Sequence, residues 1–197
     1  MPSKSIVWEP GAIYHITTRG NRKENIFREE EDFYKYLSIL QENLTYYSYL
    51  NYRLIGYCLM SNHVHLIMQT DIEPLTRLMQ RLNSIYTRYF NKKYDYVGHL
   101  FQSSYYADLI TNVMQLLEVS RYVHLNPVKA KVVEKPEHYK WSSYPIVINE
   151  RKTSLINFDM IMEYFQNNSN EYKEFVESKI VEIAEVVESA EVVESGS

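Results

Sequence analysis

The sequence of 197 residues lacks disulfide-forming cysteines and long apolar runs. Its one cysteine, Cys58, cannot form an intrachain disulfide, and this fits a reducing compartment. No apolar run reaches the roughly 18 residues that a transmembrane helix needs, so we expect no membrane span. The first ten residues, MPSKSIVWEP, lack the apolar core of a secretory signal. These absences favour a cytoplasmic globular protein.

The chain also lacks a net positive charge, since its formal charge is −4. The charge is unevenly distributed. Residues 1–140 contain 17 lysines and arginines against 14 acidic residues, a net charge of +3. Residues 141–197 contain 4 against 11, a net charge of −7. The acidity therefore belongs to the C-terminal part, and the body stays compatible with nucleic-acid binding, which its charge alone does not demonstrate.

Hydrophobic residues, in contrast, are plentiful at 45%, which is enough for a core, and 19 residues are tyrosines. The patterning of the apolar residues predicts strands at 12–18, 51–60, 63–69 and 105–110, the middle two forming a hairpin. Helical spacing predicts helices at 31–47, 74–91 and 112–126, the last of which we expect Pro127 to stop. This order is typical of an α+β, ferredoxin-like (split βαβ) fold, an antiparallel sheet with helices packed on one face.

The chain changes character after the segment WSSY, and we divide it into a domain of residues 1–145 and a C-terminal part of residues 146–197. Residues 157–180 predict one or two helices. The hexapeptide AEVVES then occurs twice in tandem, at 184–189 and 190–195. Its acidic, repetitive composition predicts a helical or disordered tail outside the core.

The sharpest local signal is the pair of histidines in His63-Val64-His65. On a strand, residues i and i+2 project from the same face, so both imidazoles point one way while Val64 anchors the strand in the core. Neutral imidazole is a good ligand for divalent metals. Such pairs also occur by chance on surface strands, so the spacing alone leaves a structural role open.

The second signal lies in the segment RYVHLNPV at 121–128. Tyr122 and Asn126 are one helical turn apart and therefore neighbours on the helix surface, beside its apolar arc. An asparagine here can also simply end a helix before proline, and a tyrosine can simply pack at the edge of a core. From these residues alone, the structural roles are favoured.

Five segments follow one another in a fixed order, and together they are far more specific than any single motif. They are YHITTRGN (14–21), CLMSNHVHLIM (58–68), GHLFQSSYY (98–106), RYVHLNPVKA (121–130) and WSSY (141–144). Over roughly residues 10–145 the chain thus resembles the IS200-like, single-tyrosine insertion-sequence transposases, particularly the branch associated with repetitive extragenic palindromes. One position departs from the family: many relatives have an arginine where this chain has Ser104.

The resemblance implies a ferredoxin-like fold and an active site. It implies that His63 and His65 bind a metal, that Asn126 completes the site, and that Tyr122 is the nucleophile that becomes joined to a 5′ phosphate. A site with a carbonyl oxygen and labile water suits Mg²⁺ or Mn²⁺, although a histidine pair also accepts Zn²⁺. The expected substrate is single-stranded DNA with hairpin or repeat sequences. The family includes homodimers in which one subunit's tyrosine serves the other's metal site, so the oligomeric state stays open.

Other residues are weaker candidates for function. A polar loop that could contact a DNA hairpin contains Arg19, Asn21, Arg22 and Lys23. A basic stripe on one helix could follow a DNA backbone or simply face solvent, and it consists of Arg77, Arg81, Arg88 and Lys92. His15 is expected to be structural or to support a metal ligand. The rival nucleophiles are Tyr105 and Tyr106, for which strand packing is favoured, and no role is assigned to His99 or His124.

The sequence therefore predicts a metal-dependent endonuclease and strand transferase, a transposase, that acts on single-stranded DNA. One alternative is a tyrosine-rich sheet that stacks unpaired bases without cutting the strand. Another is a replication-type nicking enzyme that uses the same histidine and tyrosine chemistry. The short length and the five ordered segments favour the transposase, and covalent trapping on DNA distinguishes an enzyme from a binding module.

Overall fold

The computed structural model describes residues 8–180 and residue 183. Both copies of AEVVES, and with them the predicted tail structure, lie outside the described residues. Within the described part of the chain, no helix has both the length and the apolar character needed to cross a membrane.

The body is built on a four-stranded antiparallel sheet in the order β2-β3-β1-β4. The strands are Ile13–Arg19 (β1), Arg53–Met60 (β2), His63–Gln69 (β3) and Tyr106–Ile110 (β4). Helix α1 (Glu30–Tyr46) connects β1 to β2, and α2 (Thr76–Tyr94) connects β3 to β4. Short 3₁₀ helices lie at Asn21–Lys23 (η1), Ser48–Leu50 (η2) and Pro136–His138 (η3). The predicted α+β, ferredoxin-like order of elements is confirmed.

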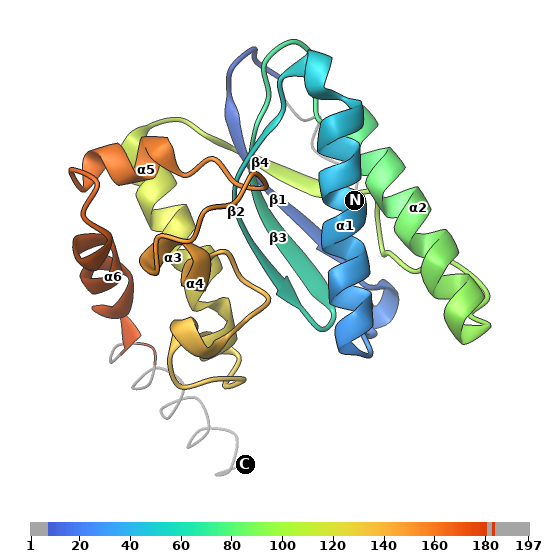
Figure 1. Cartoon of the computed structure of the whole chain (residues 1–197). Helices are drawn as coiled ribbons and strands as arrows, with labels where there is room; N and C mark the ends of the chain where they lie inside the picture. The colour runs from blue at the N-terminus through green and yellow to red at the C-terminus, as the bar shows by residue number, and fades with distance from the viewer. Residues whose placement is uncertain (1–7, 181–182, 184–197) are drawn as a thin grey trace, which may run out of the picture.

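Helices cover both faces of this sheet (Figure 1). Helices α1 and α2 lie side by side on one face, as predicted. Helix α3 (Val113–Lys129) crosses the opposite face, where the sequence pattern did not place a helix. Alternation along β1 explains the two layers. The fully buried Ile16 belongs to the α1 and α2 side, while His15 contacts the ring of Tyr122 on α3.

Helix α3 runs through Pro127 and ends at Lys129, so the prediction that this proline stops the helix is wrong. Proline removes one N–H donor, but in the last turn this costs a single intrahelical bond. Ala130 N still donates to Asn126 O at 2.9 Å, and the Asn126 side chain donates through Nδ2 to Tyr122 O at 2.9 Å. The longer helix keeps Tyr122, Asn126 and Lys129 on one continuous element.

Three further helices pack near α3, on its side of the sheet (Figure 1). They are α4 (Tyr144–Ile148), α5 (Asp159–Tyr164) and α6 (Ser169–Glu177). The last two are the helices predicted within 157–180, while the sequence pattern did not predict α4. Tyr172 lies among aromatic rings, 5.2 Å from Phe158 and 5.4 Å from Phe165 between centroids.

A buried histidine on α3, His124, joins this C-terminal region to the sheet. Its Nδ1 lies 2.7 Å from the Tyr172 hydroxyl, and its Nε2 lies 2.8 Å from Ser143 Oγ. Ser143 N in turn donates to Tyr57 O on β2 at 3.0 Å. Burial lowers the pKa of His124 to about 3, so its ring is neutral at physiological pH. A side chain at Gly56 would crowd this network, since its Cβ would lie 3.3 Å from Ser143 Oγ.

The network gives a stability prediction. Tyr172→Phe leaves the buried Nδ1 of His124 without its partner, so we expect the free energy of unfolding to fall by about 1–3 kcal/mol. Unfolding in urea, monitored by circular dichroism, measures this free energy. The matched control is Tyr164→Phe, whose side chain is exposed, and its effect should stay within about 0.5 kcal/mol. Equal effects of the two substitutions would contradict a stabilising role for the network.

The division into residues 1–145 and 146–197 stays a prediction that truncation tests. A chain ending at residue 150 loses Ile161, Tyr172 and Val176, which are fully buried. Because each such side chain contributes about 1.5–3 kcal/mol on burial, we expect this truncation to lower the melting temperature strongly or to prevent folding. A chain ending at residue 180 should melt close to the full-length protein. Equal melting temperatures for the two truncations would instead support the boundary at 145.

Candidate active site

The two histidines of β3 project onto the face of the sheet that α3 covers. In the strand register, His63 lies opposite Arg19 and His65 opposite Thr17, both on β1. The ring centroids of His63 and His65 are 4.9 Å apart. His65 is buried, with 4% of its surface exposed, and His63 is half-buried. The pair therefore lies at the boundary between the core and solvent.

Hydrogen bonds at Nδ1 leave the Nε2 atoms of both rings available. His63 Nδ1 lies 2.6 Å from the Asn62 side-chain oxygen, an acceptor, so Nδ1 carries the hydrogen and Nε2 keeps its lone pair. His65 Nδ1 lies 2.9 Å from His15 Nε2 and 3.4 Å from Thr17 Oγ1. His65 Nε2 is buried and has no hydrogen-bond partner. A buried nitrogen without a partner is costly unless a ligand binds it, and metal-binding histidines are held in this way by their other nitrogen.

Burial also keeps these rings neutral. It lowers the pKa of His65 to about 2, with further contributions from His63 and His15. It lowers the pKa of His63 to about 4, with a further contribution from the Arg19 guanidinium. The pKa of His15 is lowered by burial as well, partly offset by Asp108. At physiological pH the three rings are therefore unprotonated, as a metal ligand must be.

Tyr122 extends from α3 over the same face. Its ring centroid lies 5.6 Å from that of His65 and 5.9 Å from that of His15, in edge-on contacts. The side chain is 44% exposed, so a substrate can reach it. The Lys129 ammonium lies 5.7 Å from the centre of the Tyr122 ring and places a positive charge near the phenol.

Asn126 lies one turn after Tyr122 and is buried, with 8% exposed. Its amide nitrogen is occupied by Tyr122 O, so its amide oxygen is the atom suited to bind a cation. Among residues 8–180 and 183, no group of three or more histidine, cysteine, aspartate or glutamate residues could hold a metal ion. A metal site at His63 and His65 therefore needs a donor of another kind, such as this amide oxygen.

Within the described residues, the rival tyrosines have no ring contact with His15, His63 or His65. Tyr105 is hydrogen-bonded to Thr76 at the start of α2, with 3.0 Å between the two side-chain oxygens. Tyr106 lies opposite Thr17 in the register and so shares the face of the histidines, but its side chain is 53% exposed. Among the tyrosines that the structure describes, Tyr122 alone has ring contacts with His15 and His65.

The candidate DNA contacts separate into two groups. Arg19 lies beside His63, and its Nε is buried without a hydrogen-bond partner, while Asn21 and Arg22 follow in η1. The stripe on α2 lies on the opposite side of the sheet (Figure 1). Two of its members are engaged within the protein. Arg77 pairs with Glu73 at 3.1 Å, and Arg81 stacks on the Tyr46 ring at 4.3 Å.

Two residues at this site were not recognised from the sequence. Asn62 directly precedes His63. The sequence predicted a hairpin turn there, so the role of Asn62 as hydrogen-bond acceptor for the His63 ring was not recognised. Lys129 is seven residues, or about two helical turns, after Tyr122 and therefore shares its face. This spacing is visible in the sequence, but the expectation that Pro127 stops the helix concealed it.

Comparisons with known proteins identify one family and one solved structure of the same fold. The family described as "Transposase IS200 like" matches residues 10–126. Among curated proteins, none matches the sequence significantly. The structure of a REP-associated tyrosine transposase bound to a REP hairpin superposes with a TM-score of 0.64 at 14% identity, covering 81% of this chain and 90% of that one. It has the same fold.

Two other solved structures are less similar. A putative transposase from Deinococcus radiodurans has a TM-score of 0.42 at 16% identity, covering 61% of this chain and 95% of that one. A tRNA(His) guanylyltransferase from Saccharomyces cerevisiae also has a TM-score of 0.42, at 14% identity, covering 91% and 81%.

Proposed function

Because the chain belongs to the IS200-like transposase family, we propose that it is a metal-dependent endonuclease and strand transferase that acts on single-stranded DNA. One observation carries this proposal. The exposed phenol of Tyr122 lies 5.6 Å, between ring centroids, from His65, whose buried Nε2 has no partner. A candidate nucleophile thus lies beside a candidate metal ligand.

The residues present fit a divalent cation. His63 and His65 would bind it through Nε2, and Asn126 through its amide oxygen. Asn62 accepts a hydrogen bond from His63 Nδ1, and His65 Nδ1 lies 2.9 Å from His15 Nε2, so these neighbours hold the orientations of both rings. This mixture of nitrogen and oxygen donors suits Mg²⁺ or Mn²⁺. The ion would polarise the phosphate and offset the charge that develops on its oxygens.

Tyr122 would attack the phosphorus through its phenolic oxygen. The new bond to phosphorus replaces the bond to the 3′ oxygen, which leaves as a 3′ hydroxyl after taking up a proton, while the tyrosine has lost one. Tyr122 would then carry the 5′ phosphate, whose bond stores the energy for rejoining. The 5′ polarity comes from the family resemblance.

A single chain supplies all these groups. Tyr122 lies beside His65 of its own chain, which supports a site that is complete in a monomer, although a homodimer is compatible with it. An unpaired strand can bend its phosphate into this site more easily than a duplex. The relative with the same fold is bound to a REP hairpin, which supports hairpin-forming repeats as the DNA of this protein.

The test is incubation with single-stranded oligonucleotides that carry the flanking genomic repeats, with Mn²⁺ present. We expect a product with a free 3′ hydroxyl and a protein–DNA adduct that survives denaturing gel electrophoresis. The complementary duplex and a reaction with excess chelator should give neither. Tight binding of the single strand without cleavage or adduct would instead support a non-catalytic binding module.

A further inference from the structure

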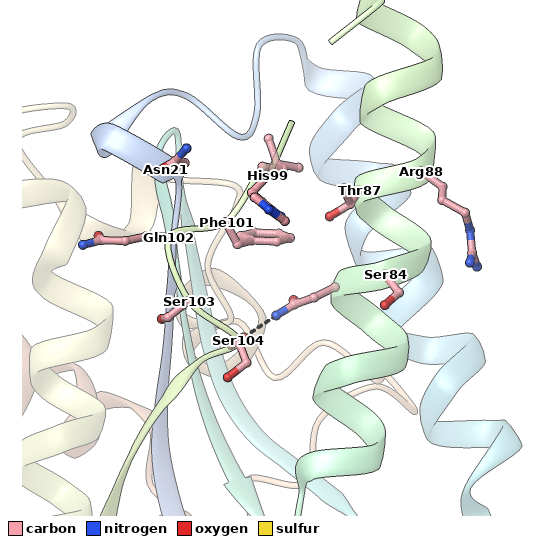
Figure 2. Close-up of a pocket in the computed structure, with 11 residues that line it drawn as sticks. Asn21, Ser84, Thr87, Arg88, His99, Phe101, Gln102, Ser103 and Ser104 are labelled. Atoms are coloured by element: carbon pink, nitrogen blue, oxygen red, sulfur yellow. Dashed lines mark hydrogen bonds between the residues drawn. The ribbon is translucent and has the colours of Figure 1, made fainter. Parts of the chain in front are cut away.

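A cavity of about 710 Å³ lies between α2 and the segment 99–104 that precedes β4 (Figure 2). The side chains of His99 and Phe101 point from this segment toward α2, and Thr87 on α2 points back toward them. Cavities of 300–1,000 Å³ are typical of small-ligand sites. The cavity belongs neither to the histidine pair nor to Tyr122, which lie on the other side of the sheet.

The cavity nevertheless borders the active site. Segment 99–104 continues the sheet edge beside β1, because Phe101 forms a bridge with Gly20, and Gln102 N donates to Arg19 O at 2.9 Å. Arg19 in turn lies opposite His63. The Gln102 side chain points away from α2, opposite to Phe101 (Figure 2). A DNA strand at the active site would thus have to cross only this edge to place a neighbouring base in the cavity.

The lining indicates what kind of group would bind. Asn83 is buried, with 8% exposed; its Nδ2 donates to Ser104 O at 2.6 Å, while its Oδ1 is buried without a partner. Phe101 offers an apolar ring and Thr87 a hydroxyl. Among the described residues that line the cavity, none is acidic, and the one arginine or lysine, Arg88, points away from the cavity (Figure 2). A phosphate would lack a counter-charge here, whereas an uncharged planar group with N–H donors fits.

We propose that this cavity binds one unpaired nucleobase of the DNA substrate, and this proposal rests on the proposed function. Phe101 would contact the face of the base, and Asn83 Oδ1 would accept a hydrogen bond from its edge. Every base offers such a donor, either an exocyclic amine or a ring N–H. The cavity would therefore anchor an unpaired nucleotide near the scissile phosphate, and a base held in a duplex could not enter it.

A substitution that fills the cavity tests this. Thr87→Trp places a large ring in the cavity from a partly exposed position on α2, without altering Asn83 or the core. The matched control is Gln80→Trp, at an exposed position of the same helix outside the cavity lining. The probe is a hairpin oligonucleotide with an unpaired flank, and the full-length protein binds it in excess chelator, so that no cleavage occurs.

Thr87→Trp should raise the Kd about tenfold, the effect of losing one stacked base, whereas Gln80→Trp should leave it unchanged. A series of oligonucleotides, each lacking one base of the flank, completes a double-mutant cycle. At one position, the missing base should weaken wild-type binding by the same factor and leave Thr87→Trp unaffected. A melting temperature equal to that of the wild type establishes that the variant is folded.

The outcomes separate this inference from the proposed function. If the wild-type protein binds and cleaves single strands but Thr87→Trp binds as tightly, the base-binding role of the cavity is wrong and the proposed function stands. The base-binding role is also wrong if Thr87→Trp raises the Kd by the same factor for every oligonucleotide of the series, because no single base then depends on the cavity. If the wild-type protein neither binds nor cleaves any single strand, both proposals are wrong.

Discussion

Replacing His63 and His65 together by alanine is expected to reduce DNA cleavage on the order of 10³-fold or more while the protein stays folded. His65 Nε2 has no hydrogen-bond partner within the described structure, and the buried Val64 between the two histidines keeps the strand anchored in the core. The variant should therefore lose metal binding without losing the sheet. Cleavage of a labelled single strand in Mn²⁺ measures the first effect, and circular dichroism the second.

Metal binding itself provides a readout that does not depend on activity. Titration calorimetry with Mn²⁺ should detect a site in the wild-type protein and none in the double variant. The matched control is His138→Ala, since His138 is exposed in η3 and should be dispensable for both binding and cleavage. Undiminished cleavage by the double variant, or full wild-type activity in excess chelator, would refute the metal site.

Much of the fold could be predicted because local patterns specify it. The alternation of apolar residues placed β3 at 63–69, as observed, and β1 within one residue. The end of α3 could not be predicted in this way. Pro127 normally breaks a helix, but here it lies in the last turn and is buried, so packing outweighs its local preference.

The candidate site shows the same division between local and long-range information. The period of a strand predicts that His63 and His65 share a face, and the period of a helix makes Tyr122 and Asn126 neighbours. Neither period reveals that Tyr122 lies over His65, because this depends on which face of the sheet α3 covers. For the same reason, the basic stripe on α2 could be predicted as a stripe but not placed relative to the histidines.

The support around His65 depends on strand register. His15 and His65 are 50 positions apart, and their hydrogen bond exists because β1 and β3 pair with Thr17 opposite His65. A shift of one residue would move His15 to the other face of the sheet. No short-range pattern contains this register, which explains why the sequence predicted only a structural or supporting role for His15.

Tyr122→Phe is expected to abolish the covalent adduct and to lower DNA cleavage by about 10³-fold or more, as removal of a nucleophile does in other enzymes. The substitution removes only the hydroxyl, and the ring can keep its contacts with His15, His65 and Lys129. Folding and DNA binding should therefore survive. The matched control is Tyr106→Phe, which removes an exposed hydroxyl on the same face and should leave the adduct intact.

Mass spectrometry of the trapped adduct identifies the nucleophile directly. Trypsin cuts after Lys93, Arg121 and Lys129, so Tyr122 falls in the peptide 122–129, whereas both rival tyrosines fall in 94–121. We expect the DNA on the first peptide, joined through a 5′ phosphate. An adduct on the second peptide, or one formed by Tyr122→Phe, would show that Tyr122 is not the nucleophile. A 3′ linkage would contradict the polarity that the family resemblance implies, whichever tyrosine carries it.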